Sequence, residues 1–141
     1  MKIVYSYYVM DILHDGHLEM LRNCRAVADK LGGILIVGIL TDEAVMEKKA
    51  RPIMSFGERY RLARSIAMID VVVTQETYSP LPNIAKIKPD ILMESGSHTD
   101  GAIGAARAVM GTLGGDVVVI PYYTLQSSSQ IKQRAREVTN A

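Results

Sequence analysis

The chain consists of short, continuous apolar runs separated by stretches in which apolar residues recur at helical spacing. Continuous runs rich in β-branched residues are typical of strands that are covered on both faces of a sheet. Five such runs occur, at residues 4–9, 34–40, 71–73, 91–93 and 117–121. We therefore predict five buried strands.

Helical periodicity fills the intervals between these runs. Gly32 and Gly33 end the first predicted helix, and Ser55 stands three residues before Glu58, which is capping-box spacing. The predicted helices cover residues 18–31, 57–69, 83–87, 101–115 and 127–138, with residues 41–52 as a short helix or loop. This alternation predicts an α/β fold: a single Rossmann-like domain over residues 1–141, with a doubly wound five-stranded parallel sheet and helices on both faces.

The overall composition excludes several classes of partner. The formal net charge is +1, so no global field attracts nucleic acid or a membrane, and any anion site must be local. Cys24 is the only cysteine and falls among apolar positions, which favours a buried thiol. No segment resembles a signal peptide or approaches the length of a membrane span, so we expect a cytoplasmic protein.

Each predicted strand is followed by a polar segment. The five segments are HDGH, KKARP, TQETYSP, ESGSHTD and YYTLQSSSQ. In parallel sheets, ligands bind beyond the carboxyl ends of the strands, where the strand order reverses. We therefore expect these segments to meet at one edge of the sheet.

His14 and His17 flank Gly16 where the chain leaves the first strand and enters a helix. A helix N-terminus offers free N–H groups and a positive dipole to an anion, and Gly16 allows close backbone approach. The histidines would add donors to a phosphoryl group. For HxGH alone, a solvated histidine pair at a helix start is at least as frequent. Zinc is disfavoured because His98 is the only other histidine.

Two further groups of residues could bind phosphate. Lys48, Lys49 and Arg51 follow the second strand and Arg59 lies in the next helix, so several cations could converge, although such runs are commonly solvated loops. The serines at 127–129 open the last helix and could form a second anion cradle. Helix capping by the first serine and the glutamine at 130 would explain them equally well.

Together these motifs resemble the HxGH nucleotidyltransferases, in particular the cytidylyltransferase branch that includes glycerol 3-phosphate cytidylyltransferase. DILHDGHLEMLRNCRAVAD is similar to the first family signature, KARPIMSFGERYRL to the second and PYYTLQSSSQIK to the third. VVTQETYSPLPNIAKIKPD is closer to the nucleotidyltransferases found with phosphoenolpyruvate mutase in phosphonate biosynthesis. The likeness spans almost the whole chain.

The resemblance implies transfer of CMP from CTP, with Mg²⁺, to the phosphonate or phosphate group of a small acceptor, releasing pyrophosphate. Such an acceptor is already an anionic nucleophile, so the main task is to position two anions and neutralise their repulsion. The resemblance also implies a homodimer.

Carried over residue by residue, the resemblance implies catalytic roles for His14, His17 and Lys49. Arg59, Ser127 and Ser128 would bind nucleotide phosphates. The other expected nucleotide contacts are Tyr8, Val9, Asp11, Gly16, Ser95 and Tyr122. The expected acceptor contacts are Lys49, Tyr7 and His98. No side chain is expected to ligate a metal, because Mg²⁺ would arrive with CTP.

The chain departs from the family pattern in three places. ESGSH replaces a G-D-D-W type stretch, Tyr7 and Tyr8 replace a glycine, and the last segment lacks the family's arginine and glycine. The tyrosines either pack on the sheet edge or contact base or acceptor. Three alternatives therefore stay open: cytidylyl transfer to a phosphate ester such as glycerol 3-phosphate or phosphoethanolamine, ATP-dependent adenylyl transfer to a sugar phosphate, and a nucleotide-binding module without turnover.

Overall fold

The computed structural model describes residues 1–121 and 128–140. Five parallel strands form one sheet in the order β3-β2-β1-β4-β5. The strands are β1 (Ile3–Tyr8), β2 (Ile34–Leu40), β3 (Val71–Gln75), β4 (Ile91–Ser95) and β5 (Asp116–Ile120). The five predicted strands are confirmed, although β3 and β4 continue for two polar residues beyond their apolar runs.

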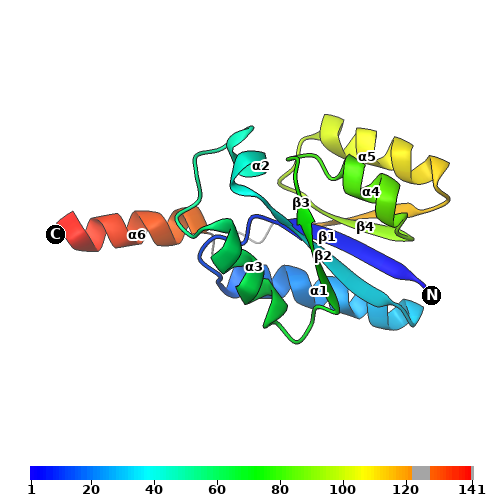
Figure 1. The fold of residues 1–141 in the computed structure, drawn as a ribbon, viewed down its shortest axis with the longest axis horizontal. Coiled ribbons are helices and arrows are strands. Elements are labelled where there is room, and N and C mark those ends of the chain that lie inside the picture. Colours follow the sequence, from blue (N-terminus) through cyan, green and yellow to red (C-terminus); the bar gives the residue numbers. More distant parts are fainter. Residues whose placement is uncertain (122–127, 141) are drawn as a thin grey trace.

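Helices cover both faces of the sheet, with α1 and α3 on one face and α4 and α5 on the other (Figure 1). The helices are α1 (Asp15–Leu31), α2 (Asp42–Met46), α3 (Phe56–Arg64), α4 (Leu81–Ile87), α5 (Asp100–Thr112) and α6 (Ser128–Asn140). This arrangement confirms the predicted doubly wound α/β fold.

The core lies in two layers, one on each side of the sheet. Leu21 and Cys24 of α1 belong to the buried cluster on the first face. Ile84 of α4 and Met110 of α5 belong to the cluster on the second face. Cys24 is completely buried, as the apolar spacing predicts.

Helix α3 ends at Arg64, five residues before the predicted end. The apolar spacing continues past the helix because Ile66 and Ile69 still pack against the core, although their backbone forms turns. Asp70 closes this turn, accepting hydrogen bonds from the Leu35 backbone N–H at 2.8 Å and from the Arg25 guanidinium at 2.7 Å. The apolar period therefore marks burial here, not helix.

The strand order reverses between β1 and β4, which are neighbours in the sheet. After β1 the chain enters α1 on one face, and after β4 it enters α5 on the other (Figure 1). The loops that follow the two strands diverge at such a point and leave room for a ligand.

Helix α6 projects away from the sheet (Figure 1) and is joined to the loop that follows β1. The Ser128 hydroxyl donates a hydrogen bond to the backbone carbonyl of Asp11. The Lys132 ammonium lies 2.5 Å from the Asp11 carboxylate. Neither α6 nor any other helix in the described ranges is long and apolar enough to cross a membrane.

Candidate functional site

A cavity of about 280 Å³ lies at the carboxyl edge of the sheet, over the reversal point between β1 and β4. Of the residues predicted for the site, its lining includes Tyr7, Tyr8, Val9, Asp11, His14, Gly16, His17, Lys49, Ser95, His98 and Ser128. Tyr122 and Ser127 lie outside the described residues. The fold therefore gathers residues from five separate parts of the chain around one space: 6–20, 40–49, 78, 93–98 and 128–129.

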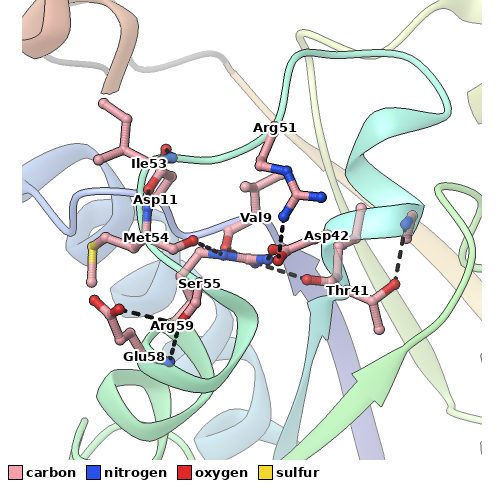
Figure 2. A network of polar contacts seen from close by, with 12 residues as sticks. Val9, Asp11, Thr41, Asp42, Arg51, Ile53, Met54, Ser55, Glu58 and Arg59 are labelled. Carbon is pink, nitrogen blue, oxygen red and sulfur yellow. Dashed lines mark hydrogen bonds and ion pairs between the residues drawn. The ribbon is translucent and has the colours of Figure 1, made fainter.

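The loop between β1 and α1 has an unfavourable backbone conformation. Met10 and Ile12 have φ angles of 59° and 53°, in the left-handed region that β-branched residues strongly disfavour. Between them, the Asp11 carboxylate accepts hydrogen bonds from the backbone N–H groups of Ile53 and Met54, each at 2.9 Å (Figure 2). The loop is thus held in place by the segment that precedes α3.

Asp11 is the anchor of this part of the site. Burial opposes its ionisation, but hydrogen bonds from Lys132 and from the backbone of Met54 and Ile53 outweigh that effect and lower its pKa. The ionised carboxylate therefore joins the β1–α1 loop, residues 53–54 and α6. Both carboxylate oxygens already accept from protein donors, and a contact with the nucleotide stays a prediction.

His14 and His17 complete the first turn of α1. Nδ1 of His14 accepts a hydrogen bond from the backbone N–H of Gly16 at 3.0 Å. Nδ1 of His17 accepts one from the backbone N–H of His14 at 3.2 Å, and the ring centroids lie 4.0 Å apart. This is a reciprocal capping arrangement built from imidazoles.

These two hydrogen bonds fix the tautomer of each ring. Because Nδ1 is an acceptor, the proton of a neutral imidazole must be on Nε2. Burial lowers the pKa of His17 to about 4, with the neighbouring His14 adding to the shift, and burial also lowers the pKa of His14. Both rings are neutral at pH 7, and each has one Nε2–H that capping does not use.

Arg59 is not among the residues that line the cavity, and its predicted contact with a nucleotide phosphate is not made in this structure and stays a prediction. Its side chain is completely buried. Its acceptors are the carbonyl oxygens of Val9 (2.7 Å), Leu40 (2.8 Å) and Met54 (3.1 Å) and the carboxylate of Asp42 (2.7 Å). Arg59 thus ties the ends of β1 and β2 to α2 and to the start of its own helix (Figure 2).

The lysine–arginine cluster is split by the fold. Lys49 lines the cavity, and its ammonium lies 5.9 Å from the ring centroid of Tyr78. Lys48 lies 5.3 Å from the same centroid but is not part of the lining. Arg51 is 3.5 Å from the Asp42 carboxylate. Within the part of the chain that the structure describes, Lys49 is the member of this cluster that faces the cavity.

Glu94 is a lining residue that the sequence analysis did not select. Its side chain is only 3% exposed. The Tyr7 hydroxyl lies 2.8 and 2.9 Å from its two carboxylate oxygens, and His98 Nε2 lies 3.6 Å from the nearer one. Burial raises the pKa of Glu94 to about 7, although the Tyr7 hydrogen bond acts in the opposite direction. An acidic residue inside the apolar strand ILMES is the signal that could have identified it.

The side chains of Tyr7 and Tyr8 lie on opposite faces of the sheet. The Tyr7 hydroxyl bonds to Glu94 on the α5 side. On the α1 side, the Tyr8 hydroxyl accepts from the Ser6 hydroxyl at 2.8 Å and lies 3.5 Å from the Cys24 sulfur. Both tyrosines therefore pack against the sheet and also line the cavity.

Metal-binding groups are dispersed in this site. In residues 1–121 and 128–140, no group of three or more histidine, cysteine, aspartate or glutamate side chains is arranged to hold a metal ion.

Comparison with known proteins identifies the family. The family model described as cytidylyltransferase-like matches residues 9–134. The chain is 34% identical over 136 residues to the bifunctional protein HldE of Citrifermentans bemidjiense, covering 94% of this chain and 27% of that protein. It is 33% identical over 139 residues to the HldE of Actinobacillus succinogenes, covering 97% of this chain and 28% of that protein. The chain thus spans about a quarter of the length of these relatives.

The fold agrees with a solved structure. The lipopolysaccharide core biosynthesis protein of Thermoplasma volcanium superimposes with a TM-score of 0.73 at 21% identity, over 89% of this chain and 99% of that one. At this identity the likeness concerns the fold alone. The match of the family model over most of the sequence places the chain in the cytidylyltransferase-like family, as a nucleotidyltransferase domain.

Proposed function

We propose that this domain transfers CMP from CTP to a phosphonate or phosphate oxygen of a small acceptor and releases pyrophosphate. The observation that most directly supports this reaction is the pair of neutral imidazoles that share one cavity with Lys49 and Ser128. Donors with a fixed tautomer can stabilise charge that develops on a phosphoryl group without reorganising during the reaction.

The reaction needs no nucleophilic side chain. An anionic acceptor oxygen attacks the α-phosphorus of CTP, the bond from that phosphorus to the bridging oxygen breaks, and pyrophosphate leaves with the electron pair. His14 and His17 would donate to the phosphoryl oxygens that gain charge, and Lys49 would hold the acceptor anion near the nucleotide. The acceptor oxygen needs no deprotonation, which agrees with a site of donors and a cation.

Mg²⁺ is the cofactor that the resemblance implies, and we propose that it enters on the triphosphate. Bound to phosphate oxygens and water, it would neutralise part of the phosphate charge. The scattered carboxylates of the cavity are consistent with this mode, since Asp11 is already bonded to Ile53, Met54 and Lys132.

For the acceptor we propose a small alkyl phosphonate. The support is the similarity of residues 72–90 to phosphonate-linked nucleotidyltransferases, together with the position of Tyr78 from this segment in the cavity wall. ATP, with a sugar phosphate as acceptor, is the second candidate. It is kept because the relatives matched over nearly the whole chain are named bifunctional protein HldE and not cytidylyltransferase.

The decisive test is pyrophosphate release by the purified protein with Mg²⁺, with CTP or ATP as donor and a panel of small phosphonates, phosphate esters and sugar phosphates as acceptors. CTP with a phosphonate should give the highest kcat/KM, and His17→Ala should abolish it. Faster turnover with ATP would replace CTP as donor. CTP binding without turnover on any acceptor, in a folded sample, would instead identify a binding module.

We also propose a homodimer, as the resemblance implies. Helix α6 extends from the body of the fold (Figure 1), and its apolar residue Val138 is 79% exposed. Sedimentation equilibrium at micromolar concentration should give twice the chain mass of 15.5 kDa. A single species of chain mass would contradict this expectation.

A further inference from the structure

The cavity contains a buried carboxylate that phosphoryl transfer does not require. Glu94 is nearly inaccessible, and its contacts in the described chain are the neutral Tyr7 hydroxyl and the His98 imidazole. Burial, followed by the nearby Lys49 and Lys48, lowers the pKa of His98. His98 is therefore uncharged at pH 7 and gives Glu94 no positive partner. A buried, unpaired carboxylate is costly, and this cost raises the pKa of Glu94 to about 7, so that a cation bound beside it would complete its ionisation at pH 7.

Positive charge lies in the same part of the cavity. Lys49 lines the wall together with Tyr78, Tyr7 and His98. Its positive charge contributes to the lowered pKa of His98. Tyr7 packs on the face of the sheet that α4 and α5 cover, and His98 precedes α5, whereas the imidazoles at 14 and 17 belong to the start of α1, which covers the opposite face (Figure 1). One part of the cavity therefore combines a lysine with a carboxylate, and the other offers neutral donors.

We infer that Glu94, with Tyr7 and His98 beside it, forms an acceptor subsite for a positively charged amine. The acceptor would be a zwitterion, with an anionic phosphonate or phosphate held by Lys49 and an ammonium group held by Glu94. This inference rests on the proposed function, because it specifies the acceptor of that reaction.

The charge balance favours an ammonium over other occupants. An ammonium would supply the cation that Glu94 lacks, and the pair would be shielded from water by Tyr7 and the wall of the cavity. A hydroxyl or the exocyclic amine of a nucleobase is neutral and would favour the protonated, uncharged form of Glu94, whereas an ammonium would favour the carboxylate and pair with it. Tyr7 already provides a neutral donor to both carboxylate oxygens.

The test compares two acceptors that differ only at the far end. Pyrophosphate release with CTP and Mg²⁺ is measured for 2-aminoethylphosphonate and 2-hydroxyethylphosphonate. Wild-type protein should show a kcat/KM about tenfold or more higher for the amine. Glu94→Gln, which keeps the shape of the side chain, should remove that preference by lowering kcat/KM for the amine alone.

A matched control and a binding measurement separate this role from a general one. Glu76→Gln makes the same charge change at an exposed position that is not part of the cavity lining, and both acceptors should turn over as in wild type. Calorimetric titration should show that Glu94→Gln changes the Kd for CTP by less than about twofold. A large loss of CTP affinity would assign Glu94 to the nucleobase and overturn the inference.

The inference can fail independently of the proposed function. Equal turnover of the two acceptors by wild type would leave cytidylyl transfer intact but remove the ammonium subsite. If neither acceptor reacts, titration of both phosphonates into CTP-loaded protein decides the matter. Preferred binding of the amine, lost in Glu94→Gln, would support the subsite, whereas equal binding would overturn it.

Discussion

The imidazoles of His14 and His17 cap the same helix turn, each accepting a backbone N–H at Nδ1, so that neither Nε2–H is needed for capping. The two interpretations that the sequence leaves open, helix capping and phosphate binding, are therefore compatible. One nitrogen of each ring holds the turn, and the other remains for a ligand. This division allows the structural and catalytic contributions to be measured separately.

His14→Asn should separate these contributions at the first position. Asparagine is a favourable N-cap residue, so the free energy of unfolding should stay within about 0.5 kcal/mol of wild type, but the shorter side chain cannot place a donor where Nε2–H lies. We expect kcat to fall by about 10²–10³-fold, as for the loss of one positioned donor. His14→Ala should lose similar activity and also about 1 kcal/mol of stability. Near-normal kcat in His14→Asn would contradict the catalytic role.

Stability should depend on pH through His17. Its pKa is about 4 in the folded protein against an ordinary value of 6.5, so between these values the unfolded chain binds more protons and the free energy of unfolding falls as pH falls. His17→Gln keeps the capping acceptor without titrating. Urea unfolding from pH 7.5 to 4.5 should show wild type losing on the order of 2 kcal/mol more than the variant.

In the difference in stability between wild type and His17→Gln, the contributions of the other titrating groups cancel. Glu94 has a raised pKa, so it makes the folded protein less stable as pH rises from about 4.5 to 7, opposite in sign to His17. Because Glu94 is present in both proteins, its contribution cancels in the difference. Parallel stability curves for wild type and variant would show that His17 is not held neutral by the fold.

The sequence predicted the fold well because the dominant physical signal is local. Continuous β-branched runs such as residues 34–40 are typical of strands buried on both faces, and β2 has those same bounds. The end of α3 was missed because Ile66 and Ile69 satisfy a helical apolar period while packing from a turn. Periodicity records which side chains are buried, and it does not distinguish these backbone conformations.

The sequence predicts which segments meet at the site, because the carboxyl ends of parallel strands share one edge, but it predicts individual contacts only within a local motif. HxGH places two imidazoles on one helix turn, so their proximity follows from spacing alone. The contact between Tyr7 and Glu94 depends on the pairing of β1 with β4, which residue spacing does not specify. Arg59 was assigned to the ligand because a buried and an exposed arginine at a helix start look the same in sequence.

Lys49 and Lys48 provide a matched pair for the acceptor anion. They are adjacent and carry the same charge, but only Lys49 is among the cavity-lining residues of the described chain. Lys49→Ala should raise KM for the acceptor by about 10- to 100-fold, the usual effect of losing a hydrogen bond to a charged group. Lys48→Ala should change it by less than about threefold at 0.15 M salt. If initial-rate measurements show equal changes in KM for the two variants, the lysines act through their general positive charge and Lys49 makes no direct contact with the acceptor.

Arg59 should behave as a structural residue. Arg59→Met would remove the donor from three backbone carbonyl oxygens and from Oδ1 of Asp42, and we expect a loss of about 3–5 kcal/mol in the free energy of unfolding. Arg61→Met, on the exposed face of the same helix, should change it by less than about 0.5 kcal/mol. Urea unfolding followed by circular dichroism measures both.

Kinetics of Arg59→Lys then test whether Arg59 also contacts the nucleotide. Lysine keeps the positive charge near Asp42 but has three donors in place of the planar guanidinium, so the variant should be destabilised yet folded at 15 °C. Since Arg59 is completely buried behind the loops, the KM for CTP of the folded fraction should stay within about twofold of wild type. A selective rise in that KM, at unchanged stability, would mean that the guanidinium turns to the phosphates when CTP binds.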